Sequence, residues 1–399
     1  MTNSRIGRNF FPMNVAPPIS SLYVHVPFCA HKCEYCAFYS HLPNRELSDR
    51  YVSALLAELE PIAHDLKPAT IFFGGGTPTL LALDQWKTIL DAFSRLGLVG
   101  AAEWTVECNP ASLSLDKAKL LRSYGVNRIS MGAQSFDEQL LDRLGRIHSR
   151  EMVFKSFDLL RKAGFDNLNI DLMFGIPGQT MQTWRKTLDE AMALNPEHLS
   201  CYEVIYEEDT PLFAQLQAGE FSVDEELACD MYEALIERAA TSGFAQYEIA
   251  NFAKSASNDL IPSRACRHNL NYWRGGSFYS IGPSATSYVR GVRTKNISNT
   301  TVYCDQLERG ALPIDWQEEL SPLARAGETA AFGLRVVAGW PFRVFQETTG
   351  FDLRETWKEE IDHLTRDDFA RLTEDRFYLT ERGLRLADWA GEQFLRSGN

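Results

Sequence analysis

Six strand-length runs of apolar and β-branched residues alternate with amphipathic, helix-length segments over the first part of this 399-residue chain. The expected strands are 21–26, 70–74, 103–108, 128–132, 167–175 and 198–204. The expected helices lie near 46–64, 80–97, 114–124, 150–163, 180–194 and 224–242. This alternation indicates a parallel sheet with right-handed crossovers, either an open doubly wound sheet or a barrel.

Three of the expected helices end in the same way. Gly125, Gly164 and Gly243 each follow a helical segment and precede an apolar residue. Because glycine readily takes the left-handed conformation that ends a helix, each is expected to cap a helix just before the next strand.

The residues with distinctive chemistry follow the predicted strands. Three cysteines come after the first strand, and the run "GGGTP" follows the second. "ECNP" ends the third strand, "GAQS" follows the fourth, and Asp171 with "GIPGQT" closes the fifth. In α/β folds of both kinds, ligand sites lie at the carboxyl ends of the strands, so we expect these clusters on one rim.

Composition limits the class of protein. Hydrophobic residues make up 45% and charged residues 23% of the chain, which is ordinary globular material for two domains. The formal net charge of −13 gives no reason to expect nucleic acid as a partner. We see neither a signal peptide nor about 20 consecutive apolar residues, and therefore expect a cytoplasmic protein. Among its eight cysteines, Cys201, Cys229 and Cys304 are expected to be small buried hydrophobic residues.

The pattern divides the chain into four expected segments. Residues 1–20 form an N-terminal arm, and residues 21–243 contain the alternating strands and helices. Residues 244–318 lose the pattern and are expected to elaborate the mouth of a barrel. Residues 319–399 are helical again, with two short strands around "TEDR" that are typical of a winged helix. Because the chain is acidic, a packing or lid role is favoured over DNA binding.

Cys29, Cys33 and Cys36 lie in "PFCAHKCEYCAFYS" with the spacing CxxxCxxC. A structural zinc site needs four ligands, commonly from two knuckles, and the sequence has no second knuckle. A thioredoxin-type pair would use Cys33 and Cys36 but would leave Cys29 unexplained. A cubic iron–sulfur cluster has four irons, so three thiolates leave one iron open to a small molecule. This interpretation accounts for all three cysteines.

The cysteine spacing and the preceding "YVHVPFC" resemble the radical S-adenosylmethionine superfamily, in the branch of oxygen-independent coproporphyrinogen dehydrogenase. The resemblance begins near Leu22 and extends into the C-terminal region. It implies an α/β fold, with a partial (β/α)6 TIM-like barrel over 21–243 and a smaller, mostly helical, HemN-C-like domain over 319–399. It also implies that the three cysteines hold a 4Fe–4S cluster whose open iron binds S-adenosylmethionine. Reductive cleavage of that cofactor gives a 5′-deoxyadenosyl radical.

The resemblance further implies a set of residues around S-adenosylmethionine. "FGGGTPT" matches the glycine motif, in which Gly74, Gly75, Gly76 and Thr77 bring bare backbone against the methionine moiety. The other matching positions are Tyr23, Tyr35, Glu107, Gln134, Arg146 and Asp171. Tyr35 is suited to stacking on adenine, the carboxylates to binding ribose hydroxyls or an ammonium, and the guanidinium to binding a carboxylate. We expect one such site.

Two departures separate the chain from the decarboxylating members of the branch. Those enzymes extend the motif to CxxxCxxCxC and carry an N-terminal extension, whereas this chain has Phe38 and only 22 residues before Tyr23. In both respects the chain is similar to HemW-type haem chaperones. "RHNLNYW" also matches their HNxxYW motif, which implies that haem is bound by His268, Asn269, Tyr272 and Trp273. A neutral imidazole ligates haem iron well, and Cys266 is a second candidate for axial ligand.

The resemblance therefore implies a haem chaperone that binds haem, a 4Fe–4S cluster and S-adenosylmethionine. Its expected partners are haem-accepting proteins, such as respiratory proteins at the membrane, and an electron donor for the cluster. The alternative is a radical enzyme, either an oxygen-independent coproporphyrinogen oxidase-like decarboxylase or a methyltransferase. A plain iron–sulfur electron carrier would leave the glycine run and the rim carboxylates without a role.

Overall fold

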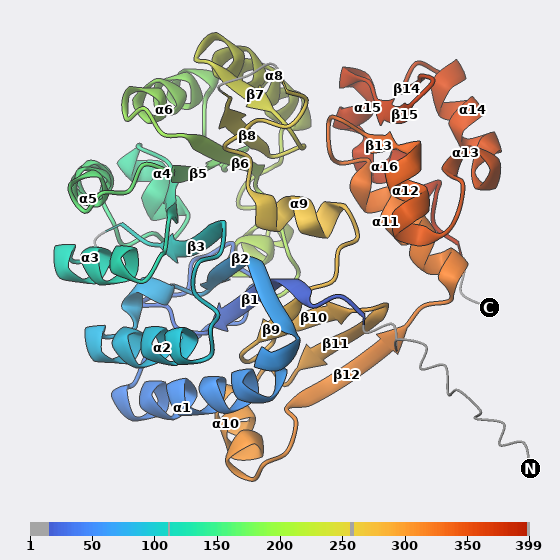
Figure 1. Cartoon of the computed structure of the whole chain (residues 1–399). Helices are drawn as coiled ribbons and strands as arrows, with labels where there is room; N and C mark the ends of the chain where they lie inside the picture. The colour runs from blue at the N-terminus through green and yellow to red at the C-terminus, as the bar shows by residue number, and fades with distance from the viewer. Residues whose placement is uncertain (1–15, 111, 256–258, 397–399) are drawn as a thin grey trace, which may run out of the picture.

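The computed structural model describes residues 16–110, 112–255 and 259–396, so residues 1–15 of the expected N-terminal arm lie outside the described part. Six parallel strands stand side by side in chain order (Figure 1). They are β1 (Ile19–Val26), β2 (Leu66–Gly75), β3 (Glu103–Cys108), β4 (Arg128–Gln134), β5 (Leu168–Phe174) and β6 (His198–Glu203). Within the described residues β1 and β6 do not pair, so the barrel is open, and the predicted partial barrel is confirmed.

Helices cover the outer face of this sheet (Figure 1). The six expected ones are α1 (Arg45–Ile62), α2 (Leu83–Arg95), α3 (Leu115–Ser123), α5 (Arg150–Lys162), α6 (Met181–Ala193) and α8 (Glu225–Thr241). Each lies within three residues of its predicted bounds. The three predicted glycine caps are confirmed, because Gly125, Gly164 and Gly243 have φ of +105°, +92° and +80°. Apolar side chains from strands and helices, such as Trp104, Trp86 and Phe93, form the main core between them.

The sheet continues beyond residue 243, where the alternating pattern ends. β8 (Asn251–Lys254) pairs antiparallel with β6, and β7 (Phe244–Gln246) pairs antiparallel with β8. At the other edge β9 (Tyr279–Ile281) pairs parallel with β1. These short strands cover the two sheet edges that a six-stranded partial barrel would leave exposed.

Several short elements were not predicted from the sequence. Four lie within the barrel region. Two are single 3₁₀ turns, η1 (Ala63–Asp65) and η2 (Pro78–Leu80), and two are short helices, α4 (Glu138–Arg143) and α7 (Pro211–Gln217). The elaboration contains α9 (Arg267–Trp273), β10 (Thr286–Val289), β11 (Val292–Asn296), α10 (Thr300–Glu308) and β12 (Ile314–Glu319). Strands β10, β11 and β12 form a separate antiparallel sheet. Each of these elements spans too few residues for hydrophobic periodicity to distinguish it from loop.

The C-terminal region forms a second core of its own. Its elements are α11 (Pro322–Gly333), β13 (Trp340–Pro341), α12 (Phe342–Thr349), α13 (Leu353–Thr356), α14 (Lys358–Arg366), β14 (Ala370–Leu372), β15 (Arg376–Leu379), α15 (Glu381–Arg385) and α16 (Ala387–Glu392). Trp340, Phe345 and Trp357 pack together at its centre. β14 and β15 form an antiparallel hairpin around "TEDR", as the sequence predicts.

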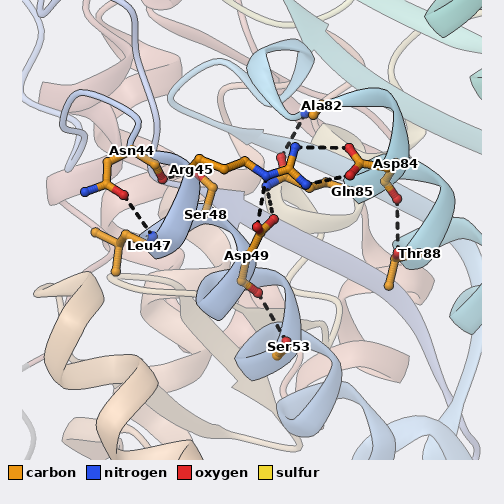
Figure 2. Close-up of polar contacts among 10 residues, drawn as sticks. All are labelled: Asn44, Arg45, Leu47, Ser48, Asp49, Ser53, Ala82, Asp84, Gln85 and Thr88. Carbon is orange, nitrogen blue, oxygen red and sulfur yellow. Dashed lines mark hydrogen bonds and ion pairs between the residues drawn. The ribbon is translucent and has the colours of Figure 1, made fainter.

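A polar network joins the beginnings of α1 and α2 (Figure 2). The Arg45 guanidinium donates to Asp49 at 2.9 Å and to Asp84 at 2.5 Å. Gln85 donates to Asp49 at 2.7 Å and accepts from the Ala82 amide at 2.8 Å. The arginine and both aspartates are exposed, so these ion pairs add little to stability. They link the two helices that follow the cysteines and the glycine run.

A carboxylate on α1 holds the elaboration against the barrel. Glu58 accepts hydrogen bonds from the Gly282 amide at 2.8 Å, from Asn296 at 2.6 Å and from the Tyr303 hydroxyl at 2.5 Å. Burial raises its pKa to about 7 although all three donors lower it. Glu58 therefore takes up a proton in the folded protein at pH values where it is ionised in the unfolded chain.

This shift predicts a specific pH dependence of stability. Because the folded pKa exceeds the ordinary value of 4.5, the free energy of unfolding contributed by Glu58 falls as pH rises from about 4.5 to 7. The free energy of unfolding of Glu58→Gln, relative to that of the native chain, should therefore rise by roughly 2 kcal/mol between pH 5 and pH 8. This figure allows for the partial exposure of the Glu58 side chain. Denaturant unfolding of both proteins at the two pH values measures this. Parallel pH dependence in the two proteins would contradict it.

Candidate functional site

The inner face of the sheet, opposite the helices, is polar. Strand register places these residues side by side on it: Ser21, Tyr23, His25, Thr70, Phe72, Gly74, Glu103, Thr105, Glu107, Arg128, Ser130, Gly132, Asn169, Asp171, His198 and Ser200. The alternate residues, such as Trp104, Ile129 and Leu199, belong to the main core. Buried parallel strands are usually apolar on both faces, so a polar inner face indicates a ligand site.

Glu107 and Asp171 bring two carboxyl groups to this inner face. Burial, and then the Asp171 charge, raise the pKa of Glu107 to about 8. Asp171 accepts from Asn169 at 2.7 Å and from Ser130 at 3.3 Å, and burial raises its pKa as well. Asp171 is the fourth of seven residues in β5 and does not close the strand as expected. Two half-buried carboxyl groups with raised pKa values suit a cationic or hydroxyl-bearing ligand.

The three cysteines lie in one loop, residues 27–43, which we call the cysteine loop. The thiols of Cys29, Cys33 and Cys36 are free and partly exposed. Burial raises the pKa of the Cys36 thiol, and the neighbouring Cys33 and Cys29 thiols raise it further. The Cys36 amide donates to the Cys33 carbonyl at 3.2 Å, which makes a tight turn between these two ligands.

The glycine run packs directly against this loop. The Gly76 amide donates to the Val26 carbonyl at 2.8 Å, and the Thr77 amide donates to the Phe28 carbonyl at 2.7 Å. A Cβ atom at Gly75 would lie 2.5 Å from the His25 ring, and φ at Gly75 is +101°. A Cβ at Gly76 would lie 2.6 Å from the Phe28 carbonyl oxygen. Both glycines are therefore required by the fold itself, whatever the backbone binds.

Arg146 connects the cysteine loop with the strand ends. Its guanidinium donates to the Cys33 sulfur at 3.4 Å, to the Gly132 carbonyl at 2.7 Å and to the Asn109 side chain. Its Nε atom is buried and has no hydrogen-bond partner among the described residues. The positive charge of this guanidinium therefore lies beside one of the three thiols and can be paired with negative charge in the adjacent space.

Gln134 ends β4 with a strained backbone. Its φ is +64°, which is uncommon for a residue other than glycine, and the register with β5 shifts at this point. Such bulges re-aim side chains and are frequent beside functional sites.

Two further predicted site residues are tyrosines, Tyr23 and Tyr35. Tyr23 is stacked on Phe72 with ring centroids 6.1 Å apart, and Tyr35 packs against the small apolar cluster around Leu144 and Leu212.

The donor set fits an iron–sulfur cluster better than a single ion. Within the described residues, no three histidine, cysteine or acidic side chains converge on one point as a mononuclear metal requires. A cubic cluster takes one thiolate per iron, so its ligands stand further apart. A cavity of about 200 Å³ lies beside the loop, and Cys33, Thr77, Asn109 and Arg146 line it. The three free thiols and the adjacent space fit such a cluster.

The HNxxYW motif forms α9, which lies across the inner face at the opposite end of the strands. His268 is 1% exposed. Its Nδ1 lies 2.9 Å from the Thr70 hydroxyl and 3.1 Å from that of Ser21, and its Nε2 lies 2.7 Å from the Tyr272 hydroxyl. Both ring nitrogens are thus engaged, and burial lowers the pKa of the imidazole to about 3.

The other members of the motif are partly exposed. Trp273 lies 6.5 Å from Phe332 between ring centroids, under the Arg335 guanidinium at 5.2 Å, and its indole nitrogen has no partner among the described residues. Asn269 is also partly exposed.

Cys266, the second candidate for axial ligand, is fully buried, and its sulfur lies 3.4 Å from Glu103. Burial raises the pKa of this thiol to about 12, which disfavours Cys266 as an axial thiolate.

The sequence interpretation missed two buried charges in this region. Glu103, at the start of β3, accepts from the amides of Arg267 and His268 at 2.9 and 3.0 Å and so caps α9. Arg128, at the start of β4, is 2% exposed, and its Nε has no partner among the described residues. The signal was present, because polar residues recur at every second position in "EWTVE" and "RISMG".

Outside the site, Cys201 and Cys304 are buried as predicted, but Cys229 is exposed, because it lies on the outer face of α8. Among the described residues, no helix has both the length and the apolar character needed to cross a bilayer.

The chain matches two sequence families. Residues 23–191 match the Radical SAM superfamily, and residues 320–386 match the HemN C-terminal domain. "Heme chaperone HemW" of Bacillus subtilis (strain 168) is 34% identical over 383 residues, which cover 94% of this chain and 99% of that protein. The protein of the same name from Escherichia coli (strain K12) is 39% identical over 274 residues, covering 67% and 70%.

Among solved structures, coproporphyrinogen III oxidase (HemN) from Escherichia coli matches with a TM-score of 0.81 and 22% identity, covering 95% of this chain and 90% of that one. This match shows a shared fold. The fold and the two family matches define the radical S-adenosylmethionine class, which implies a 4Fe–4S cluster and S-adenosylmethionine. Because relatives match over nearly the whole length, the chain belongs to the HemW family within this class, as the sequence motifs predicted.

Proposed function

We propose that this protein is a haem chaperone that binds haem together with a 4Fe–4S cluster and S-adenosylmethionine, and passes haem to acceptor proteins. The observation that carries the proposal is the position of α9. The HNxxYW motif lies on the polar inner face of the same sheet whose rim holds the cysteine loop. A haem-associated motif and a cluster site therefore share one interior, which supports a function that couples them.

The cysteine loop supplies three thiolates for the cluster, Cys29, Cys33 and Cys36, and Phe38 leaves the fourth iron without a protein ligand. The cluster can supply one electron to a bound sulfonium. Glu107 and Asp171 would bind the ribose or the ammonium of S-adenosylmethionine and so hold the cofactor in place. Burial favours the neutral acid form of Glu107. A bound cation would favour the carboxylate and so lower the pKa of Glu107.

Arg146 has two roles in this proposal. It neutralises the thiolate of Cys33, and it keeps a buried Nε donor for the carboxylate of the cofactor. Gly74 leaves room for the Glu107 carboxylate, since a Cβ at this position would lie 3.0 Å from it. Thr77 lines the cavity beside the cysteine loop. Gln134, Tyr23 and Tyr35 are assigned to the same cofactor because they match the family positions that contact it.

Haem binding at the motif requires a local rearrangement. His268 Nε2 is occupied by the Tyr272 hydroxyl, so iron coordination by this atom must displace that hydroxyl. Tyr272 and Trp273 then provide flat faces for the porphyrin, and Asn269 provides a hydrogen-bonding group at its edge. Haem acceptors and the electron donor are proposed as transient partners of the holo protein.

Haemin titration of matched variants tests the motif. We expect His268→Ala to weaken haemin binding at least tenfold, about 1.4 kcal/mol, because it removes the axial ligand. Tyr272→Phe keeps the aromatic face but releases Nε2, and it should bind haemin at least as tightly as the native chain. Absorption spectra and dissociation constants measure both. Equal haemin affinity and an unchanged spectrum in His268→Ala would exclude His268 as the ligand.

A further inference from the structure

We propose that Thr300, the first residue of α10, is a positioning residue for the cysteine loop, and that it sets how well the loop holds its three thiolates in place for a cluster. The inference rests on the proposed cluster-binding function of the loop. It concerns a residue of the elaboration that lies 261 positions beyond Tyr39 in sequence and is 2% exposed.

The cysteine loop is closed at its base. Phe28 and His41 form a parallel β-bridge, in which the Cys29 amide donates to the His41 carbonyl at 3.0 Å. The His41 amide donates to the Pro27 carbonyl at 2.9 Å. The rings of Phe28 and His41 meet edge to face, with centroids 5.2 Å apart. All three cysteines therefore lie between the two residues of this bridge, and the base fixes where the loop begins and ends.

Thr300 contacts both side chains at this base. The His41 Nδ1 donates to the Leu42 carbonyl at 3.0 Å, so Nε2 accepts from the Thr300 hydroxyl at 2.9 Å. The same hydroxyl accepts from the Tyr39 hydroxyl at 3.2 Å, and the Tyr39 oxygen accepts from the Thr300 amide at 2.9 Å. That amide is one of the unpaired donors of the first turn of α10, so the cysteine loop completes the end of the helix.

α10 is itself fastened to the barrel, which makes Thr300 a fixed point. Arg50 of α1 donates to Asp305 at 2.7 Å and to Glu308 at 2.8 Å, and Tyr303 donates to Glu58. Figure 1 shows α10 lying against α1. The loop is thus held from outside by an element that belongs to the elaboration and not to the barrel.

The contact continues from the base toward the glycine run. His25 Nε2 donates to the Tyr39 carbonyl at 3.0 Å. The His25 ring in turn fills the space that a side chain at Gly75 would occupy. Near the middle of the loop, the Glu34 amide donates to the Leu144 carbonyl, and the Leu212 amide donates to the Glu34 carbonyl. Cys36 lies between the anchored residues Glu34 and Tyr39. Loss of the contacts at the base therefore frees the half of the loop that carries Cys36.

Thr300→Val tests the proposal because it removes the hydroxyl while keeping the shape and the backbone amide. We expect iodoacetamide to alkylate Cys36 of the cluster-free protein about five- to tenfold faster than in the native chain, since two hydrogen bonds are lost. Peptide mass spectrometry follows each cysteine, and the exposed Cys229 serves as an internal reference. Thr300→Ser should restore the native rate. Thr301→Val, at the adjacent exposed threonine, should leave it unchanged.

The anaerobically reconstituted proteins provide the second measurement. Thr300→Val should lose iron to a chelator several-fold faster than Thr301→Val, and Tyr39→Phe should behave as an intermediate case because it removes the same contact from the loop side. Equal alkylation and iron-loss rates in Thr300→Val and Thr301→Val would overturn the proposal. If the native chain holds no cluster, the proposed function fails, but the alkylation rates still decide the role of Thr300.

Discussion

Cys33→Ser is expected to abolish the 4Fe–4S cluster, leaving iron and sulfide near background after anaerobic reconstitution. The cysteine loop offers three thiolates and no spare, so a missing ligand leaves two irons open instead of one. A serine hydroxyl at this position keeps the contact with Arg146 but cannot serve as the soft thiolate ligand that iron–sulfur clusters use. Iron and sulfide analysis with the absorption spectrum measures the loss, and Cys29→Ser and Cys36→Ser should behave alike.

Cys304→Ser is the matched control. Cys304 is fully buried in the main core and lies on α10, but it is not one of the three thiols of the loop. A serine at this position leaves the Thr300 contacts in place, so the cluster content should be unchanged. A Cys33→Ser protein with full cluster content would contradict the assignment of the loop.

Glu103→Ala is expected to lower the free energy of unfolding by about 3 to 5 kcal/mol. Glu103 is 4% exposed and accepts from two amides at the start of α9, so its removal leaves those donors buried and unpaired. It also leaves the buried Arg128 guanidinium without one of its neighbouring negative charges. Denaturant unfolding of the cluster-free protein measures the change. Because α9 carries the HNxxYW motif, haemin binding should weaken in the same variant.

Glu103→Gln separates the two causes. It keeps a carbonyl acceptor for α9 but removes the charge opposite Arg128, so its loss should be smaller than that of Glu103→Ala. A loss below about 1 kcal/mol in Glu103→Ala would show that α9 is held by its apolar contacts alone.

The barrel was predictable because its signals are local and long. Each strand in "SLYVHV" or "EWTVEC" is bounded by turn residues, and each amphipathic helix presents its apolar face over several turns. The elaboration was not predictable in the same way. β9 pairs with β1 across more than 250 residues of chain, and α9 is held by Glu103 and Thr70, contacts that no local pattern encodes.

The candidate site divides along the same line. Spacing indicated the cysteines and the glycine run because their chemistry depends on near neighbours in sequence. The burial of His268 was not predictable, since it results from hydroxyl groups on β1 and β2 that meet the ring only after folding. Thr300 carries no signal at all in the sequence, because its role depends on where α10 docks.

One anaerobic experiment tests the account most directly. The reconstituted protein is incubated with dithionite, S-adenosylmethionine and either haemin or coproporphyrinogen, and the tetrapyrroles are analysed afterwards. The account predicts haem that is bound and chemically unmodified, and coproporphyrinogen that is returned intact. Decarboxylated porphyrin, formed together with 5′-deoxyadenosine, would contradict it and identify a radical enzyme.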